Sequence, residues 1–329
     1  MRTRSQETNT MEKRFLLSVV MLLMLVVSGL QIVAAQDVDT TTPVYEALKG
    51  AEPQFGAVES VVNFESMGQN VVGTLVVPDG GEAPYPIVLL FHGFTGQRNE
   101  MDIIDAGETM YGRTARMLAG QGYASLRIDF RGSGESDGSW EDTTFSGQIA
   151  DAIAAIDFVE TLDNIDSERL GVIGLSQGGL VAASLSARDD RVKTTILWSA
   201  VANPAHTYAL VLSQEAVDAG LASGGEPVTA VLPWGAETTL RTGFFEELFT
   251  VDPVAEIAEF EGPLMVVAGL RDTIVTPQPY AGQAYINYHE GPEMLLVVDG
   301  DHMLDILGPG PALLDGVVTW ALAWFQQTL

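Results

Sequence analysis

The chain of 329 residues is long enough for one large domain or two small ones, and its 47% of hydrophobic residues can bury a substantial core. Its formal net charge of −28 repels nucleic acid and anionic membranes, so neither is an expected partner. The absence of cysteine excludes disulfides, thiol catalysis and cysteine-ligated zinc.

The N-terminal segment has the form of a secretory signal peptide. Lys13 and Arg14 precede an apolar run that begins at Phe15, and the segment closes on the small residues VAA at 33–35. We therefore predict that residues 1–35 are a signal peptide and that the protein is secreted or periplasmic, with no stable membrane partner once the segment is cleaved. The alternative is an uncleaved membrane anchor, because the apolar run is nearly long enough to span a bilayer.

A loose N-terminal lead-in is predicted at residues 36–55, which are polar and contain proline. From residue 56 onward, strand patterns alternate with helix patterns. Strands are expected at 57–66, 70–78, 84–94, 123–130, 169–175, 193–200, 263–270 and 293–300, and helices at 109–122, 146–162, 177–187, 277–289 and 311–329. This alternation predicts a single α/β catalytic domain, residues 56–329, with a mostly parallel sheet.

The alternation stops between residues 201 and 262, a stretch far longer than an ordinary connection between elements. Two parts of it, residues 215–223 and 242–260, have partly helical patterns. We interpret residues 201–262 as an insertion into the domain rather than as a second domain.

A serine between glycines follows the strand predicted at 169–175. Gly174, Ser176 and Gly178 form the pattern G-x-S-x-G where a strand runs into a helix. The chain must turn sharply there, and side chains at the two glycine positions would collide with the neighbouring strand and helix. Such a turn lifts a serine hydroxyl clear of the sheet, so Ser176 is the candidate nucleophile. The alternative is an ordinary glycine-rich turn.

A nucleophilic serine needs a base within hydrogen-bond reach. Of the four histidines, His302 lies in a loop after a predicted strand, at the same sheet edge as Ser176. His92 follows another strand and is expected to be a structural hydrogen-bonding residue, and His289 to cap a helix.

The base needs an acid to hold its tautomer. Asp272 also follows a strand, and the order Ser176, Asp272, His302 is typical of α/β-hydrolases. Asp252 is the alternative acid.

The site also needs backbone N–H donors for a developing negative charge. Gly93 lets the backbone bend after the strand at 84–94, so that the amide of Phe94 can face the serine. The amide of Gln177, directly after the nucleophile, is the expected second donor. No phosphate-binding loop or metal-ligand spacing is present, so neither a cofactor nor a metal is expected.

Five motifs, HGFTG, DFRGSGESDG, GLSQGG, GLRDTIV and GDH, together resemble the α/β-hydrolases over about residues 55–329. Among these, the set is similar to carboxylesterases of the cinnamoyl/feruloyl esterase type. The resemblance implies an α/β-hydrolase fold with a central sheet flanked by helices and a small lid-like insertion after the sixth strand, covering the acyl pocket. One departure is Leu175, where the family usually has histidine before the nucleophile.

The insertion contains aromatic residues that suit an apolar pocket wall: Trp234, Phe244, Phe245 and Phe249. They could equally pack in the insertion's own core. The resemblance implies a serine carboxylesterase that cleaves a small-molecule ester. The short insertion with its aromatic residues predicts a preference for small or aromatic acyl groups. One alternative is a serine peptidase of the prolyl-oligopeptidase type. The other is a non-catalytic binding module on a hydrolase scaffold.

Overall fold

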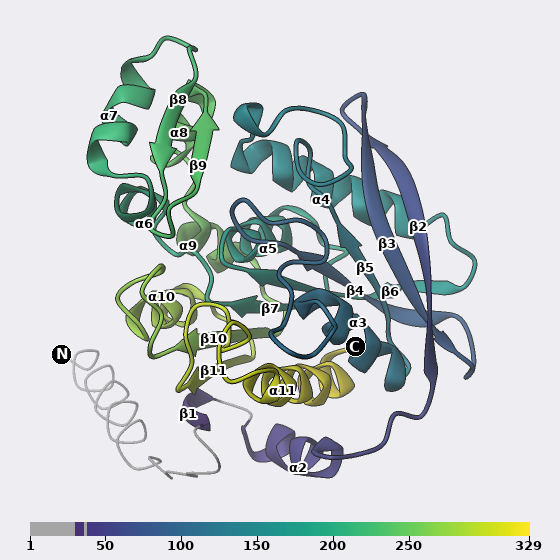
Figure 1. Ribbon diagram of the computed structural model, residues 1–329. Helices are drawn as coiled ribbons and strands as arrows, with labels where there is room; N and C mark the ends of the chain where they lie inside the picture. The colour runs from purple at the N-terminus through teal and green to yellow at the C-terminus, as the bar shows by residue number, and fades with distance from the viewer. Residues whose placement is uncertain (1–29, 36–37) are drawn as a thin grey trace, which may run out of the picture.

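The computed structural model describes residues 30–35 and 38–329 (Figure 1). Its main sheet has the strand order β1-β11-β10-β7-β6-β4-β5-β3-β2. The strands are β1 (Leu30–Ala35), β2 (Gly56–Ser66), β3 (Gln69–Asp79), β4 (Tyr85–Phe91), β5 (Ala124–Ile128), β6 (Ile165–Leu175), β7 (Thr194–Trp198), β10 (Leu264–Gly269) and β11 (Glu293–Val298). The six neighbouring strands in the middle of the sheet are parallel: β5, β4, β6, β7, β10 and β11. At the edges, β3 pairs antiparallel with β5, β2 with β3, and β1 with β11.

Helices cover both faces of this sheet, which explains why the central strands are apolar along their whole length. Buried side chains of α4, α5 and α10 pack on one face, and those of α2, α3 and α11 pack on the other. The helices are α2 (Val38–Leu48), α3 (Met110–Gly120), α4 (Phe145–Val159), α5 (Gln177–Arg188), α10 (Tyr280–Tyr288) and α11 (Ala312–Thr328), with a 3₁₀ turn η1 (Trp140–Asp142) before α4. The predicted fold class is confirmed: the chain has the α/β-hydrolase fold.

The predicted insertion lies between β7 and β10, and β7 is the sixth strand when counting starts at β2. In Figure 1 it forms the green lobe at the upper left. Its elements are α6 (Pro204–Val211), α7 (Gln214–Ala222), β8 (Val228–Val231), β9 (Glu237–Leu240), α8 (Thr242–Glu247), α9 (Pro253–Glu256) and η2 (Ile257–Glu259). The β8–β9 hairpin, a separate antiparallel pair, was not anticipated because its strands are only four residues long.

The prediction of a loose lead-in at residues 36–55 is wrong for much of its length, because α2 forms there and packs on α11 (Figure 1). The ring of Tyr45 stacks on Trp320 with 4.2 Å between centroids, and Gln327 Nε2 donates to Thr41 Oγ1 at 2.9 Å. Burial against α11 stabilises a short helix that its own polar sequence would not hold in water.

The predicted signal peptide lies outside the described residues except for Leu30–Ala35. That segment is β1, paired antiparallel with β11. Among the helices of the described residues, none has both the length and the apolar character needed to cross a membrane.

Candidate active site

Ser176 occupies the tight turn between β6 and α5, with φ 55° and ψ −115°. A Cβ on Gly174 would lie 2.1 Å from the carbonyl oxygen of Gly178, and a Cβ on Gly178 would lie 2.1 Å from that of Phe91. No side chain fits at such distances, so both positions require glycine. The turn thereby presents Ser176 in the wall of a cavity at the N-terminus of α5.

Asp272 and His302 come from the loops that follow β10 and β11. Asp272 Oδ2 lies 2.8 Å from His302 Nδ1, while Oδ1 accepts the amides of Ile274 at 2.8 Å and Val275 at 3.0 Å. Because an ionised carboxylate can only accept, Nδ1 carries the proton of the neutral imidazole and Nε2 keeps its lone pair. The Asp272 side chain is fully buried, so this orientation is protected from water.

The other candidate acid has a different role in the structure. Asp252 caps α9 by accepting the amide of Ala255 at 3.0 Å. The structure therefore brings Asp272, and not Asp252, to His302.

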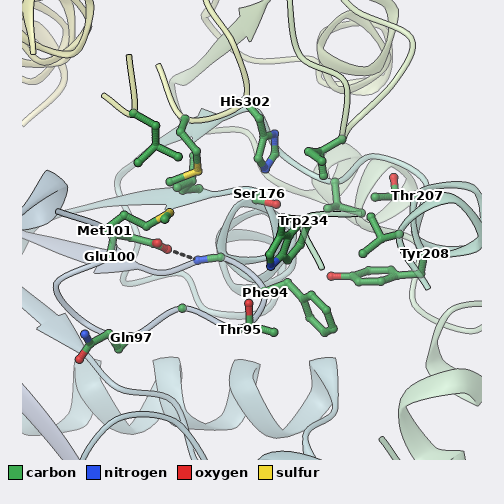
Figure 2. A pocket seen from close by; sticks show the side chains of 18 residues that line it. Phe94, Thr95, Gln97, Glu100, Met101, Ser176, Thr207, Tyr208, Trp234 and His302 are labelled. Atoms are coloured by element: carbon green, nitrogen blue, oxygen red, sulfur yellow. Dashed lines mark hydrogen bonds between the residues drawn. The ribbon is translucent and has the colours of Figure 1, made fainter. Parts of the chain in front are cut away.

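Ser176 and His302 line one cavity of about 490 Å³ (Figure 2). Phe94 lines it as well, and Gln177 is the first residue of α5, whose opening amides have no acceptor inside the helix. The two residues predicted to supply amide donors thus come from separate segments, Phe94 from the loop after β4 and Gln177 from the start of α5.

His92 does not line this cavity and is fully buried beside it. Its Nδ1 lies 2.8 Å from the carbonyl oxygen of Gly93, and its Nε2 accepts the amide of Phe130 at 3.2 Å. Burial lowers the pKa of His92 to about 4, so the imidazole is neutral and both nitrogens tie the β4 loop to the end of β5. This geometry agrees with the structural role expected for His92.

The cavity has two sides, one on each side of Ser176 (Figure 2). Thr207 and Tyr208 of α6 lie on the insertion side, and Glu100 and Met101 lie on the opposite side. The complete lining is Gly93, Phe94, Thr95, Gly96, Gln97, Glu100, Met101, Leu175, Ser176, Val201, Thr207, Tyr208, Val211, Trp234, Ile274, His302, Met303 and Leu307. Apolar side chains predominate, which suits an uncharged organic group.

Of the four insertion aromatics predicted to form the pocket wall, only Trp234 lines the cavity. Phe244 and Phe245 are each 1% exposed, and Phe249 is exposed away from the cavity. Phe244 packs edge-on against Tyr208 with centroids 5.0 Å apart, so it supports the wall from behind. The pattern of aromatics could not separate these positions, because the direction of each side chain depends on how α8 packs.

Two contributors to the site were missed by sequence reasoning. Tyr208 lies in α6, which was not anticipated, and its hydroxyl donates to Gln177 Oε1. Glu100 lies in the loop after HGFTG, where a single acidic residue gave no signal. Burial raises the pKa of Glu100 to about 7. In the described part of the chain, no three or more acidic or histidine side chains are grouped as a metal site would need.

The strand order and the serine at the β6–α5 turn define the class as α/β-hydrolase in fold. A family model described as X-Pro dipeptidyl-peptidase (S15 family) matches residues 68–226. The putative hydrolase YtaP of Bacillus subtilis is 29% identical over 167 residues, covering 46% of this chain and 55% of that protein. The chain spans about half the length of the curated relatives it matches.

Solved structures that share the fold include Est1E and an acetyl xylan esterase. Est1E from Butyrivibrio proteoclasticus, with ferulic acid bound, is 22% identical with a TM-score of 0.64, covering 81% of this chain and 98% of that one. An acetyl xylan esterase from Paenibacillus sp. R4 is 18% identical with a TM-score of 0.60, covering 89% and 95%. Together with the strand order, these structures show that the chain has the α/β-hydrolase fold.

Proposed function

We propose that the protein is a serine carboxylesterase. The observation that carries this proposal is that His302, hydrogen-bonded to the buried Asp272 at 2.8 Å, lines the same cavity as a serine held at a strand-to-helix turn. Ser176 attacks the ester carbonyl while His302 Nε2 takes its proton, and Asp272 balances the resulting imidazolium. The amides of Phe94 and Gln177 stabilise the oxyanion. His302 then returns the proton to the leaving alcohol and activates water to hydrolyse the acyl-enzyme.

The cavity supports a preference for small or aromatic acyl groups. A volume of about 490 Å³ suits a compact group, and Trp234, Tyr208 and Phe94 offer aromatic surface. Est1E, which binds ferulic acid, and the acetyl xylan esterase point to the same two substrate classes. We propose feruloyl-type or acetyl esters in preference to long-chain lipids.

A serine peptidase is the second candidate, favoured by the family model matched at residues 68–226. The experiment compares kcat/KM for acetate, butyrate, ferulate and palmitate esters with that for an X-Pro dipeptidyl anilide. We expect the acetate or ferulate ester to be cleaved fastest. Anilide hydrolysis as fast as the best ester would favour the peptidase, and palmitate cleaved best at an oil–water interface would favour a lipase.

Ser176→Ala tests the nucleophile in the same assays, and Ser184→Ala, a buried serine of α5, is the matched control. We expect Ser176→Ala to lose at least about 10³-fold in kcat, and Ser184→Ala to stay close to wild type. An active Ser176→Ala enzyme would exclude the proposal.

We also propose that residues 1–35 direct export, so that the enzyme works outside the cytoplasm. N-terminal sequencing of protein recovered from the secreted or periplasmic fraction tests this, and a first residue at Gln36 is the expected result. Recovery only in the membrane fraction would indicate an anchor.

A further inference from the structure

Glu100 is a buried carboxyl group in the wall of the cavity that the proposed reaction does not use. It is 8% exposed and lines the cavity together with Ser176 and His302. Its backbone has φ 56°, a left-handed conformation that is costly for a residue other than glycine. Burial of an ionisable side chain and a strained backbone are both unfavourable, so a specific contact of Glu100 must offset them.

The carboxyl group of Glu100 is enclosed by the loop that follows β4. Its Oε1 accepts the amide of Gly93, shown as the dashed line in Figure 2. The amide of Gly96 in turn donates to the carbonyl oxygen of Gly93 at 3.1 Å. A Cβ on Gly96 would lie 2.9 Å from Oε1, so the loop wraps the carboxylate as closely as glycine allows.

This contact lies directly beside the nucleophile proposed above, Ser176. A Cβ built on Gly93 lies 3.4 Å from Ser176 Cβ, so the loop runs directly past the serine. The amide of Gly93 is bound to Glu100 and its carbonyl oxygen accepts the amide of Gly96, so Gly93 is held at both ends, and its carbonyl group belongs to the peptide that carries the amide of Phe94. Phe94 itself lines the cavity.

We propose that Glu100 is a positioning residue: its carboxylate holds the amide of Gly93 and thereby aims the amide of Phe94 at the oxyanion. The inference rests on the proposed function, because it assigns a role in the same reaction. Glu100 acts through Gly93 and not on the substrate.

Two titratable groups face Glu100. His302 lies across the cavity, and Tyr111 of α3 packs behind the loop, where burial raises its pKa well above 10 and keeps it neutral. Burial raises the pKa of Glu100 to about 7, so the charge of its carboxyl group changes near neutral pH. An ionised carboxylate binds an amide more strongly than a neutral carboxyl group does. The loop is therefore held most firmly above pH 7.

The test uses Glu100→Leu and Glu100→Gln in the full chain. Asp105→Leu is the matched control, because Asp105 is an exposed acid of the same loop with φ 59° and does not line the cavity. Each variant is assayed for kcat, KM, the Ki of a trifluoromethyl ketone and the rate of fluorophosphonate labelling, with melting temperature as the check on folding.

Glu100→Leu should lower kcat and the labelling rate about 30- to 100-fold and weaken ketone inhibition by a similar factor, with KM changed less than about threefold. Glu100→Gln keeps a neutral acceptor of the same size that binds the amide of Gly93 less strongly than the carboxylate does, so at pH 8 its kcat should be about three- to fivefold below wild type. Below pH 6 the wild-type carboxyl group of Glu100 is protonated and neutral as well, so the ratio of wild-type kcat to Glu100→Gln kcat should fall toward 1.

Two results would overturn the inference while leaving the proposed function intact: wild-type labelling by Glu100→Leu, or a ratio of wild-type to Glu100→Gln kcat that stays the same from pH 8 to below pH 6. The second keeps the test decisive if Glu100→Leu does not fold. Failure of the wild-type enzyme to label at all would instead overturn the proposed function, and this inference with it.

Discussion

Ser176 holds a backbone conformation, φ 55° and ψ −115°, that costs a non-glycine residue about 1–3 kcal/mol. The turn persists because the strand and helix on either side are packed into the centre of the domain. Gly178 is the contact point, since its Cα faces the carbonyl oxygen of Phe91 at the end of β4. The packing of β4, β6 and α5 therefore offsets the free-energy cost of the strained backbone at Ser176.

Replacing Gly178 should expose this dependence. In Gly178→Ala, the added Cβ would lie 2.1 Å from the carbonyl oxygen of Phe91, and backbone cannot move aside as a flexible side chain can. We expect a loss of about 3 kcal/mol or more in the free energy of unfolding, measured by urea titration. Gly308→Ala, where the nearest atom is 3.9 Å away, should change it by less than about 0.5 kcal/mol. Equal stability of the two variants would contradict the steric argument.

His302 and Asp272 should behave as one unit with Ser176. His302→Ala removes the proposed base and should lower kcat at least about 10³-fold, and Asp272→Asn should lower it about 10²- to 10⁴-fold by disturbing the tautomer of the imidazole. Circular dichroism checks that both variants are folded. Asp252→Asn is the matched control and should keep full activity. A mild Asp272→Asn phenotype together with a severe one for Asp252→Asn would reverse the assignment of the acid.

The buried carboxyl group of Glu100 should also leave a signature in stability. Burial raises its pKa from 4.5 to about 7, so the folded state holds its proton more tightly than the unfolded chain does. Stability is therefore lost as the pH rises from 4.5 through 7, and the neutral amide in Glu100→Gln escapes this loss. Relative to wild type, Glu100→Gln should gain about 2–3 kcal/mol between pH 4.5 and pH 8. A difference that does not vary with pH would show that Glu100 titrates normally.

The insertion is connected to the catalytic core through α6. The hydroxyl of Tyr208 donates to Gln177 Oε1, and Gln177 Nε2 donates to Gln148 Oε1 of α4 at 2.7 Å. The side chain beside the proposed oxyanion amide is thus held between the insertion and a helix of the sheet layer. This connection makes the insertion part of the site wall rather than a separate cover.

Trp234 tests what the insertion contributes to substrate choice. It is 52% exposed and lines the cavity, whereas Phe249 of the same insertion is 59% exposed and does not. Trp234→Ala should raise KM for a ferulate ester about tenfold and leave acetate nearly unchanged, because only the aromatic acyl group loses a contact surface. Phe249→Ala should leave both substrates unchanged. Equal effects of the two substitutions would place the acyl group elsewhere.

The charge of the whole molecule sets its response to salt. The chain has 44 acidic and 16 basic residues, and many arginines already pair with acids, as Arg113 does with Asp315. Most remaining surface charges are negative and repel one another, a cost that salt screens. The melting temperature should rise by about 3–5 °C between 0.02 and 0.5 M NaCl. KCl at the same ionic strength should act alike, and a falling melting temperature would mean that the ion pairs outweigh the repulsion.

The order of residues along the chain was enough to predict much of the fold and of the candidate site. The alternating apolar strands and helices, and the collision that makes Gly174 and Gly178 obligatory, follow from bond geometry and side-chain periodicity within a few residues. The loops that bear Ser176, Asp272 and His302 could be placed at one sheet edge because parallel strands end together. Contacts between residues that are far apart in the sequence could not be predicted from these local patterns. The ring of Tyr45 stabilises α2 by stacking on Trp320. Glu100 accepts the amide of Gly93 because the loop between them folds back on itself. Such contacts depend on three-dimensional packing, which no window of neighbouring residues contains.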